Sequence, residues 1–296
     1  MSVIRTLIAT SAIAGLLACG QSSGPSIQTG APLGAASAPV VAKPEVGLVM
    51  KTLTNPFFVE MEKGARRAEA DLGVKLIVKT AAQETSIEQQ IQLVEDLINA
   101  KVGAIVIAPG DSQRLIPALK KAADAGIKVV NIDNRLAPDV VAQTGMPPIP
   151  FVGVNNEAGA YQAAKALAQG VTAPTDAIIL EGIRSADNAR QRMEGARRAF
   201  AENKHIRIVA SEPANWEIDK AHAVTKTLFA KHGSIQLVFA ANDMMAIGAV
   251  KYLQDSGRKG VKVMGYDALT EALSEVQAGR MFGTVDQQAA EQGYQG

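Results

Sequence analysis

Short apolar segments alternate with segments of helical periodicity from residue 45 to residue 278 of this 296-residue chain. Apolar runs of this kind, bounded by turn residues, are typical of strands buried in a parallel sheet. Aromatic residues make up only 4% of the chain, so the core consists mostly of Ala, Val, Ile and Leu. The alternation predicts an α/β fold in which helices cover parallel sheets.

The pattern gives an expected position for each element. Strands are predicted at residues 45–51, 74–79, 104–108, 127–133, 151–154, 177–180, 206–210, 237–241 and 261–266. Helices are predicted at residues 56–72, 87–100, 113–125, 157–169, 189–202, 218–231, 244–255 and 269–278.

A Pro-rich connection divides the pattern in two. It runs from Pro138 to Pro150, and the strand–helix alternation restarts near residue 155. A length near 300 residues also suits two domains better than one. We therefore expect two doubly wound lobes joined by a hinge, residues 45–154 and 155–286, with residues 287–296 returning to the first lobe.

The N-terminal segment predicts export. Arg5 is the only charge before Lys43, and a short apolar stretch ends at Cys19, the only cysteine. This is the form of a secretory signal over residues 1–18, too short for a membrane span. The position of Cys19 resembles a lipoprotein lipobox, so we expect lipidation there; a cleaved signal with an incidental cysteine is the alternative. Residues 19–44 would then be a lipidated cysteine and a flexible Ser/Gly/Pro/Ala linker.

Composition argues against several functions. Without residues 1–18 the chain has 29 basic and 29 acidic residues, so its net charge is 29 − 29 = 0, and it has no basic run that would bind nucleic acid. There is no dinucleotide glycine fingerprint, phosphate loop or nucleophile elbow. The three histidines lack metal-ligand spacing. We expect no enzyme activity, no cofactor and no metal.

Polar residues follow four of the apolar segments, where ligands bind in open α/β sheets. The first segment, ending at residue 50, is followed by Lys51, Asn55, Phe57 and Phe58. The second, ending at residue 132, is followed by Asp133, Asn134 and Arg135. The third is followed by Asn242, and the fourth ends in Tyr266 and is followed by Asp267. Carboxylates accept from sugar hydroxyls, guanidinium donates to them in a fork, and aromatic rings cover the C–H face of a sugar. Together with Arg190 and Trp216, this set suits carbohydrate binding.

Several of these residues and their neighbours also have a purely structural interpretation. Asn55 can simply cap the helix that begins at Pro56, and Asp243 can cap the next helix beside Asn242. Arg190 lies on a helix with several other arginines, so it can be a surface charge. Trp216 can belong to a small satellite core.

Taken together, these segments resemble the bacterial periplasmic sugar-binding proteins of the ribose and galactose type, which feed ABC transporters. The resemblance runs from residue 46 to residue 288, and the ribose-binding branch is the most similar. It implies two lobes of the type I periplasmic binding fold that close on a monosaccharide by hinge motion. Segment 52–58 resembles the first binding loop, with its asparagine and two phenylalanines. Residues 188–195 resemble the segment whose first arginine, Arg190 here, contacts sugar.

Five further segments complete the resemblance. Residues 132–133 resemble the strand end whose aspartate binds hydroxyls, and residues 212–216 resemble the loop that carries the aromatic of the second lobe. Residues 239–243 and 265–267 resemble two other binding strands. Residues 283–287 resemble the return segment with a ligand-contacting glutamine, Gln287. The implied partners are a monosaccharide or polyol and an ABC permease, with a lipid anchor as the only membrane contact, for a monomeric protein.

Departures from the ribose pattern point to a different sugar. Lys51 stands where ribose binders have a serine, Ala108 where they have an asparagine, and Asn134 where they have an arginine. Trp216 and Tyr266 replace phenylalanines. We therefore expect a hexose or polyol rather than ribose. An acidic or phosphorylated sugar is the alternative, because Lys51, Arg135 and Arg190 would tolerate its charge. The family continues beyond the Gln287 segment through one more helix and strand, so the end at Gly296 suggests a truncated sequence.

The leading hypothesis is an extracytoplasmic, periplasm-facing lipoprotein that delivers a monosaccharide to an ABC importer. A sensor that presents the sugar to a chemoreceptor or histidine kinase would share the same fold and is the alternative. A regulator of the lac-repressor type would need an N-terminal helix-turn-helix, which residues 1–44 do not contain.

Overall fold

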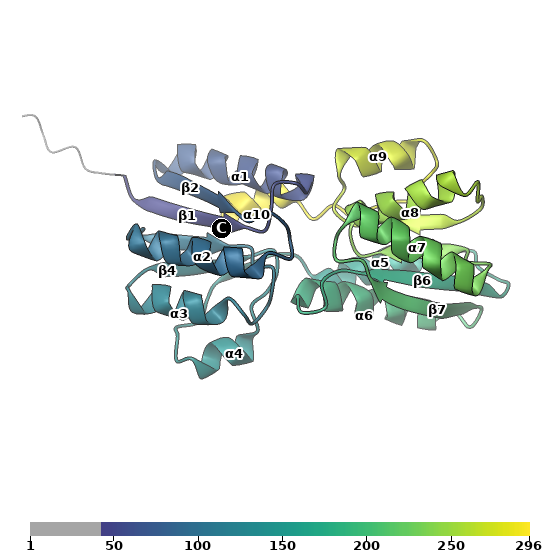
Figure 1. The fold of residues 1–296 in the computed structure, drawn as a ribbon, viewed down its shortest axis with the longest axis horizontal. Helices are drawn as coiled ribbons and strands as arrows, with labels where there is room; N and C mark the ends of the chain where they lie inside the picture. The colour runs from purple at the N-terminus through teal and green to yellow at the C-terminus, as the bar shows by residue number, and fades with distance from the viewer. Residues whose placement is uncertain (1–42) are drawn as a thin grey trace, which may run out of the picture. The chain divides into compact units, whose positions relative to one another are not determined.

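Parallel sheets form the centre of both halves of residues 43–296, which are the residues that the computed structural model describes (Figure 1). The predicted signal peptide, Cys19 and the linker up to residue 42 lie outside the described residues. Within residues 43–296, no helix has both the length and the apolar character that crossing a bilayer requires.

The first lobe contains a five-stranded parallel sheet in the order β2-β1-β3-β4-β5. Its strands are β1 (Glu45–Met50), β2 (Lys75–Thr80), β3 (Ala104–Ile107), β4 (Lys128–Ile132) and β5 (Phe151–Val152). Its helices are α1 (Pro56–Leu72), α2 (Ile87–Asn99), α3 (Ile116–Asp124), α4 (Pro138–Gln143) and α10 (Ala289–Gln295).

Successive residues of β1 face opposite sides of this sheet, as strand geometry requires. Leu48 and Met50 pack with Met61 of α1, whereas Val49 packs with Val94 and the other apolar residues of α2 and α3. Both faces of the sheet are therefore covered, which explains why β1 is apolar throughout.

The second lobe contains a four-stranded parallel sheet in the order β7-β6-β8-β9. Its strands are β6 (Thr175–Glu181), β7 (Ile206–Pro213), β8 (Leu237–Ala240) and β9 (Lys262–Met264). Its helices are α5 (Asn156–Ala168), α6 (Asp187–Ala201), α7 (Ile218–His232), α8 (Asp243–Asp255) and α9 (Thr270–Gln277).

Glycine allows the helices of the second lobe to pack closely in pairs. A Cβ on Gly195 of α6 would lie 2.3 Å from the carbonyl oxygen of Glu157 on α5. A Cβ on Gly248 of α8 would lie equally close, 2.3 Å, to the carbonyl oxygen of Ile218 on α7. These close approaches suit a core with few aromatic residues.

Two chain segments join the lobes. The first connects β5 to α5, between Val152 and Asn156. The second begins beside β9, where Gly265 donates to the carbonyl of Gly283 at 2.9 Å and Asp267 donates to that of Val285 at 2.8 Å. It then returns to α10, which packs against α1 (Figure 1).

The predicted fold class of two α/β lobes with parallel sheets is confirmed. Two helices were not expected. α4 lies inside the Pro-rich connection, where Pro138 occupies the first helical turn, a position that tolerates proline because its missing N–H has no helical partner there. α10 forms in the return segment, which is polar and carries no clear apolar periodicity.

Candidate functional site

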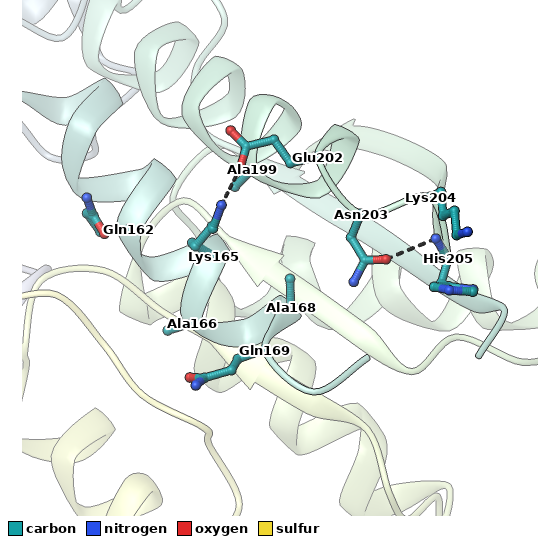
Figure 2. Close-up of a pocket in the computed structure, with 10 residues that line it drawn as sticks. All are labelled: Gln162, Lys165, Ala166, Ala168, Gln169, Ala199, Glu202, Asn203, Lys204 and His205. Carbon is teal, nitrogen blue, oxygen red and sulfur yellow. Dashed lines mark hydrogen bonds and ion pairs between the residues drawn. The ribbon is translucent and has the colours of Figure 1, made fainter. Parts of the chain in front are cut away.

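The site lies between the lobes and not in the hollow at the far end of the second lobe. That hollow, of about 860 Å³, lies between the C-terminal ends of α5 and α6, at the amino ends of β6 and β7 (Figure 2). Lys165 there is bonded to Glu202, and the Asn203 side chain accepts from the His205 backbone at 3.0 Å. None of the residues that the sequence predicted for the site lines it.

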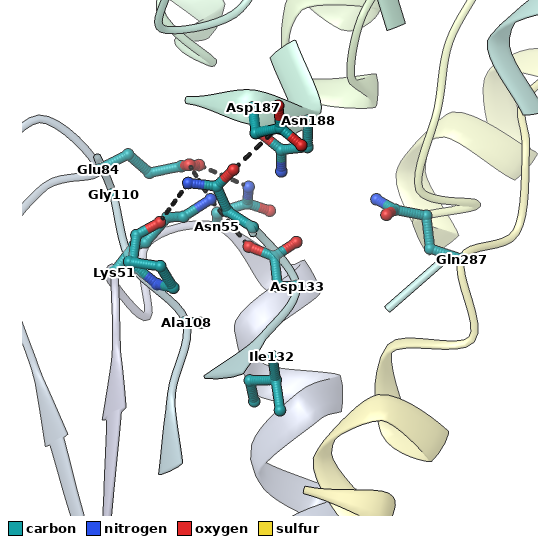
Figure 3. Close-up of polar contacts among 12 residues, drawn as sticks. Lys51, Asn55, Glu84, Ala108, Gly110, Ile132, Asp133, Asp187, Asn188 and Gln287 are labelled. Carbon is teal, nitrogen blue, oxygen red and sulfur yellow. Dashed lines mark hydrogen bonds and ion pairs between the residues drawn. The ribbon is translucent and has the colours of Figure 1, made fainter. Parts of the chain in front are cut away.

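In the first lobe, charged and amide groups meet where the strands end. Lys51 directly follows β1 and Asp133 directly follows β4, and their Nζ and Oδ2 atoms lie 2.8 Å apart. Glu84, from the loop after β2, lies 3.9 Å from the same ammonium. Asn55 donates its side-chain amide to Glu84 at 2.8 Å, and Figure 3 shows these four side chains turned toward one another. The carboxyl ends of parallel strands thus create one buried polar cluster.

Asn55 also fixes the start of α1. Its Oδ1 accepts from the Phe57 backbone N–H at 3.0 Å, so the capping role foreseen as an alternative is present together with a position in the site. Phe57 and Phe58 follow in the first turn, with ring centroids 5.2 Å apart and planes at 87°. Lys51 Nζ lies 5.4 Å from the Phe58 centroid. The two rings form an apolar wall beside the polar cluster.

In the second lobe a buried arginine organises the site. The Arg192 side chain donates to Asn156 Oδ1 at 2.8 Å, to the Ala241 carbonyl at 2.9 Å and to Gln287 Oε1 at 2.7 Å. Asp267 Oδ1 lies 3.7 Å from its Nη1. These partners come from α5, the residue after β8, the segment after β9 and the return segment, so Arg192 ties four parts of the chain together.

The remaining groups of the second lobe surround Arg192. Trp216 is in the loop after β7, and the centroid of its ring lies 5.6 Å from Arg192 Cζ. The centroid of the Tyr266 ring lies 4.1 Å from the same atom. Asn242 caps α8 by accepting from Met245 N–H at 2.9 Å. Gln287 donates its amide to Asp267. A sheet end, a helix start and the return segment therefore supply polar groups to one place.

The two clusters face each other across one buried site. Its lining consists of Lys51, Asn55, Phe57, Phe58, Glu84, Asp133, Asn188, Arg192, Trp216, Asn242, Asp267 and Gln287. The remaining cavity is about 20 Å³, space for about one water molecule. A larger ligand can enter only if the lobes separate and the facing side chains exchange partners with it.

Backbone conformation near the site is unusual. Asp133 has φ 62° and Asp267 has φ 137°, in the region that non-glycine residues seldom adopt. Trp216 has φ 71° and follows Asn215 at φ 53°. Such conformations cost about 1–3 kcal/mol each and tend to gather at functional sites.

Burial changes the acidity of two carboxyls in the site. Burial raises the pKa of Glu84 to about 7, although the nearby Lys51 ammonium opposes this shift. Burial also raises the pKa of Asp267 well above its usual range, opposed by Arg192. Two further polar atoms, Asn188 Oδ1 and Trp216 Nε1, are buried without a hydrogen-bond partner among residues 43–296. The site thus has unused capacity to accept and donate hydrogen bonds.

The structure does not bring Arg190 to the site. Its side chain is 44% exposed and bonds to Asp187 of the same helix at 3.0 Å. Arg192, two residues later, occupies the site because it shares a helix face with the buried residues Gly195, Ala196 and Ala199. In this structure Arg192 is therefore the arginine of this segment that lines the site, and Arg190 has the surface position foreseen as its alternative.

Three other predicted residues lie outside the lining. Arg135 is exposed and stacks over the Phe151 ring, 4.9 Å from its centroid. Tyr266 is buried behind Arg192. Asn134 is fully buried, but its amide oxygen accepts from the Asn188 backbone N–H at 3.2 Å. Asn134 and Tyr266 thus support the site without lining it.

Sequence reasoning missed Glu84, Asn188 and Arg192. Glu84 lies in a loop that carries no pattern. Asn188 and Arg192 are one helical turn apart, and the small buried residues that follow them at helical spacing could have identified their face. Among residues 43–296, no group of three or more His, Cys, Asp or Glu side chains is arranged to hold a metal ion.

Comparisons with known proteins agree on one family. Residues 46–296 match the profile described as a periplasmic binding protein domain. The chain is 40% identical over 264 residues to a D-ribose/D-allose-binding protein of Pseudomonas aeruginosa, covering 88% of this chain and 82% of that protein. It is 34% identical over 257 residues to the D-allose-binding periplasmic protein of Escherichia coli, covering 86% and 83%.

A solved structure gives the same result. An ABC transporter periplasmic solute binding protein from Actinobacillus succinogenes with bound D-allose superposes with a TM-score of 0.79 at 43% identity, covering 84% of this chain and 87% of that one. The relatives are binding and import proteins, which agrees with the expectation that the chain is not an enzyme. This chain belongs to the periplasmic binding protein domain family.

Proposed function

We propose that this chain is an extracytoplasmic lipoprotein that binds a monosaccharide between its two lobes and delivers it to an ABC importer. The observation that carries the proposal is the buried site to which both lobes contribute carboxylates, amides, a guanidinium and aromatic rings. This set matches a sugar, whose hydroxyls both donate and accept while its ring carbons present an apolar face.

D-allose is the sugar that we expect to bind best. The relatives named above bind D-allose or D-ribose. D-allose shares the ring hydroxyl configuration of D-ribose and adds a hydroxymethyl group. Lys51 supplies a long donor where the ribose pattern has a serine, which favours the ligand with the additional hydroxyl. A site that pairs hydroxyls discriminates strongly when one pairing is lost.

Calorimetric titration with D-allose, D-ribose, D-galactose, myo-inositol and a sugar acid tests this proposal. The expected result is saturable binding of D-allose, with D-ribose weaker. Ribose binding more tightly than every other sugar would contradict the specificity argument. Failure of all five to bind would contradict the proposed function itself.

The lipid anchor needs a separate test. If Cys19 is lipidated, the Cys19→Ser variant should move from the membrane fraction to the soluble fraction of cells. The same variant should bind sugar as the wild type does, because the anchor lies outside the sugar-binding lobes. Unchanged membrane association of Cys19→Ser would contradict lipidation.

A further inference from the structure

Three hydrogen bonds join the lobes directly, beside the site. The Asp187 backbone N–H donates to Ser112 Oγ at 2.9 Å, and the Asn188 backbone N–H donates to Asn134 Oδ1 at 3.2 Å. The Ser112 backbone N–H donates to the Ser185 carbonyl at 3.1 Å. We call Ser112 and Asn134, together with backbone 185–188, the latch. Figure 3 shows Asp187 and Asn188 facing the first-lobe cluster.

The latch is buried and held in a fixed orientation. Ser112 is 1% exposed and Asn134 is 0% exposed. The Asn134 side chain donates to the Pro109 carbonyl at 3.0 Å, which turns its amide oxygen toward the second lobe. The Ala137 backbone donates to the Ser112 carbonyl at 2.8 Å and fixes that loop in turn. The first lobe therefore presents two oriented acceptors.

Helix α6 lacks a cap of its own. Ala186 occupies its N-cap position and has no side chain that could accept a hydrogen bond. The first N–H groups of a helix have no partner within the helix, and an N-cap side chain normally satisfies one of them. Here Ser112 and Asn134 of the opposite lobe accept from the first two residues of α6. Lobe separation breaks both bonds.

The latch contacts helix α6, which carries residues that line the site. The side chains of the latch itself do not line the site. Neither Ser112 nor Asn134 belongs to the lining, whereas Asn188 and Arg192 of α6 do. The bonds therefore exist only when the lobes are closed and α6 is in its site position.

We propose that Ser112 and Asn134 are positioning residues that set sugar affinity without touching the sugar, by capping α6 across the closed cleft. Apparent affinity falls with the fraction of molecules able to reach the closed form. Loss of one such bond should weaken apparent affinity about fivefold, and loss of both about tenfold or more. The prediction for affinity rests on the proposed sugar-binding function; the closure bonds themselves do not.

Hydrogen exchange of the full chain, read by mass spectrometry, tests the latch without any ligand. In the Ser112→Ala/Asn134→Ala variant, which loses both side-chain bonds, the peptide covering residues 183–190 should exchange about tenfold faster than in the wild type, because closed molecules are fewer. A peptide within α8 should exchange unchanged. Equal rates at residues 183–190 in the two proteins would overturn the proposal. The single Ser112→Ala variant serves if the double variant fails to fold.

Sugar titration supplies the second arm. With D-allose and D-ribose as probes, Ser112→Ala and Asn134→Ala should each bind about fivefold more weakly, mainly through faster dissociation. Ser256→Ala is the matched control: Ser256 directly follows α8 and its hydroxyl donates to the Tyr252 carbonyl at 2.8 Å, so its loss should leave affinity unchanged.

The outcomes separate the two proposals. If the wild type binds neither sugar, the proposed function fails, and the exchange experiment still decides on the latch. If the wild type binds but both latch variants bind equally well, the latch proposal fails and the function stands.

Discussion

Arg190 and Arg192 lie two positions apart on α6 but have opposite surroundings. Replacing Arg192 by alanine removes the donor to Asn156 Oδ1 and Gln287 Oε1 and the positive charge beside Asp267 in a buried site. Breaking a hydrogen bond to a charged group costs about 1.5–3 kcal/mol, so sugar affinity should fall at least about tenfold. Arg190→Ala is the control and should bind within about twofold of the wild type. Equal losses in the two variants, measured by titration calorimetry, would contradict the position given to Arg192.

Glu84 should make the stability of the sugar-free protein depend on pH. Its side chain is 9% exposed, and burial raises the pKa of the carboxyl from 4.5 to about 7 in the folded protein. A raised pKa means that its contribution to stability is complete below pH 4.5 and is lost as the pH rises through about 7. Glu84→Gln cannot ionise and should escape this loss.

The measurement is the free energy of unfolding of wild type and Glu84→Gln in urea across this pH range. The wild type should lose roughly 3 kcal/mol relative to the variant between pH 4.5 and pH 8. If the difference in free energy of unfolding between wild type and Glu84→Gln does not change with pH, burial does not raise the pKa of Glu84.

At the residue scale, strand ends could be predicted and helix faces could not. Lys51, Asp133 and Asp267 were found because the carboxyl ends of parallel strands meet at one edge, a rule that needs only the strand pattern. To predict Arg192 one would have to know which side of α6 faces the cleft, because this segment contains several arginines. Glu84 lies in an irregular loop, and only the folded chain brings it to Asn55.

At the scale of elements, the contact of α10 with α1 depends on two glycines. A Cβ on Gly64 would lie 1.7 Å from the Ala290 carbonyl oxygen, and one on Gly293 would lie 2.0 Å from that of Met61. Gly64→Ala should therefore destabilise the first lobe by about 1–3 kcal/mol, although alanine favours helices. Gly103→Ala is the control, because its Cβ meets nothing closer than 3.5 Å. The measurement is thermal unfolding. A lower melting temperature for Gly103→Ala than for Gly64→Ala would contradict this packing.

The order of elements could be read from the sequence because each buried strand is a short apolar run between turn residues. The two unexpected helices lack that signal. α4 is six residues long and proline-rich around its ends, and α10 is polar along most of its length. Tertiary contact with α1 stabilises α10 more than its own sequence does.

At the scale of the whole binding unit, the site exists only where the lobes meet. The first lobe supplies Lys51, Asn55, Glu84 and Asp133, and the second supplies Arg192, Asp267 and their neighbours. With a residual cavity of about 20 Å³, binding must be coupled to separation and closure of the lobes. Ligands bind such proteins by shifting the population toward the closed form.

The most direct test of this account is a crystal structure of the protein grown with D-allose. We predict one sugar between the lobes, with hydroxyls bonded to Asp133 of the first lobe and to Arg192 or Asp267 of the second, and its ring against Phe57, Phe58 or Trp216. A sugar bound elsewhere, or held by one lobe alone, would contradict the central claim.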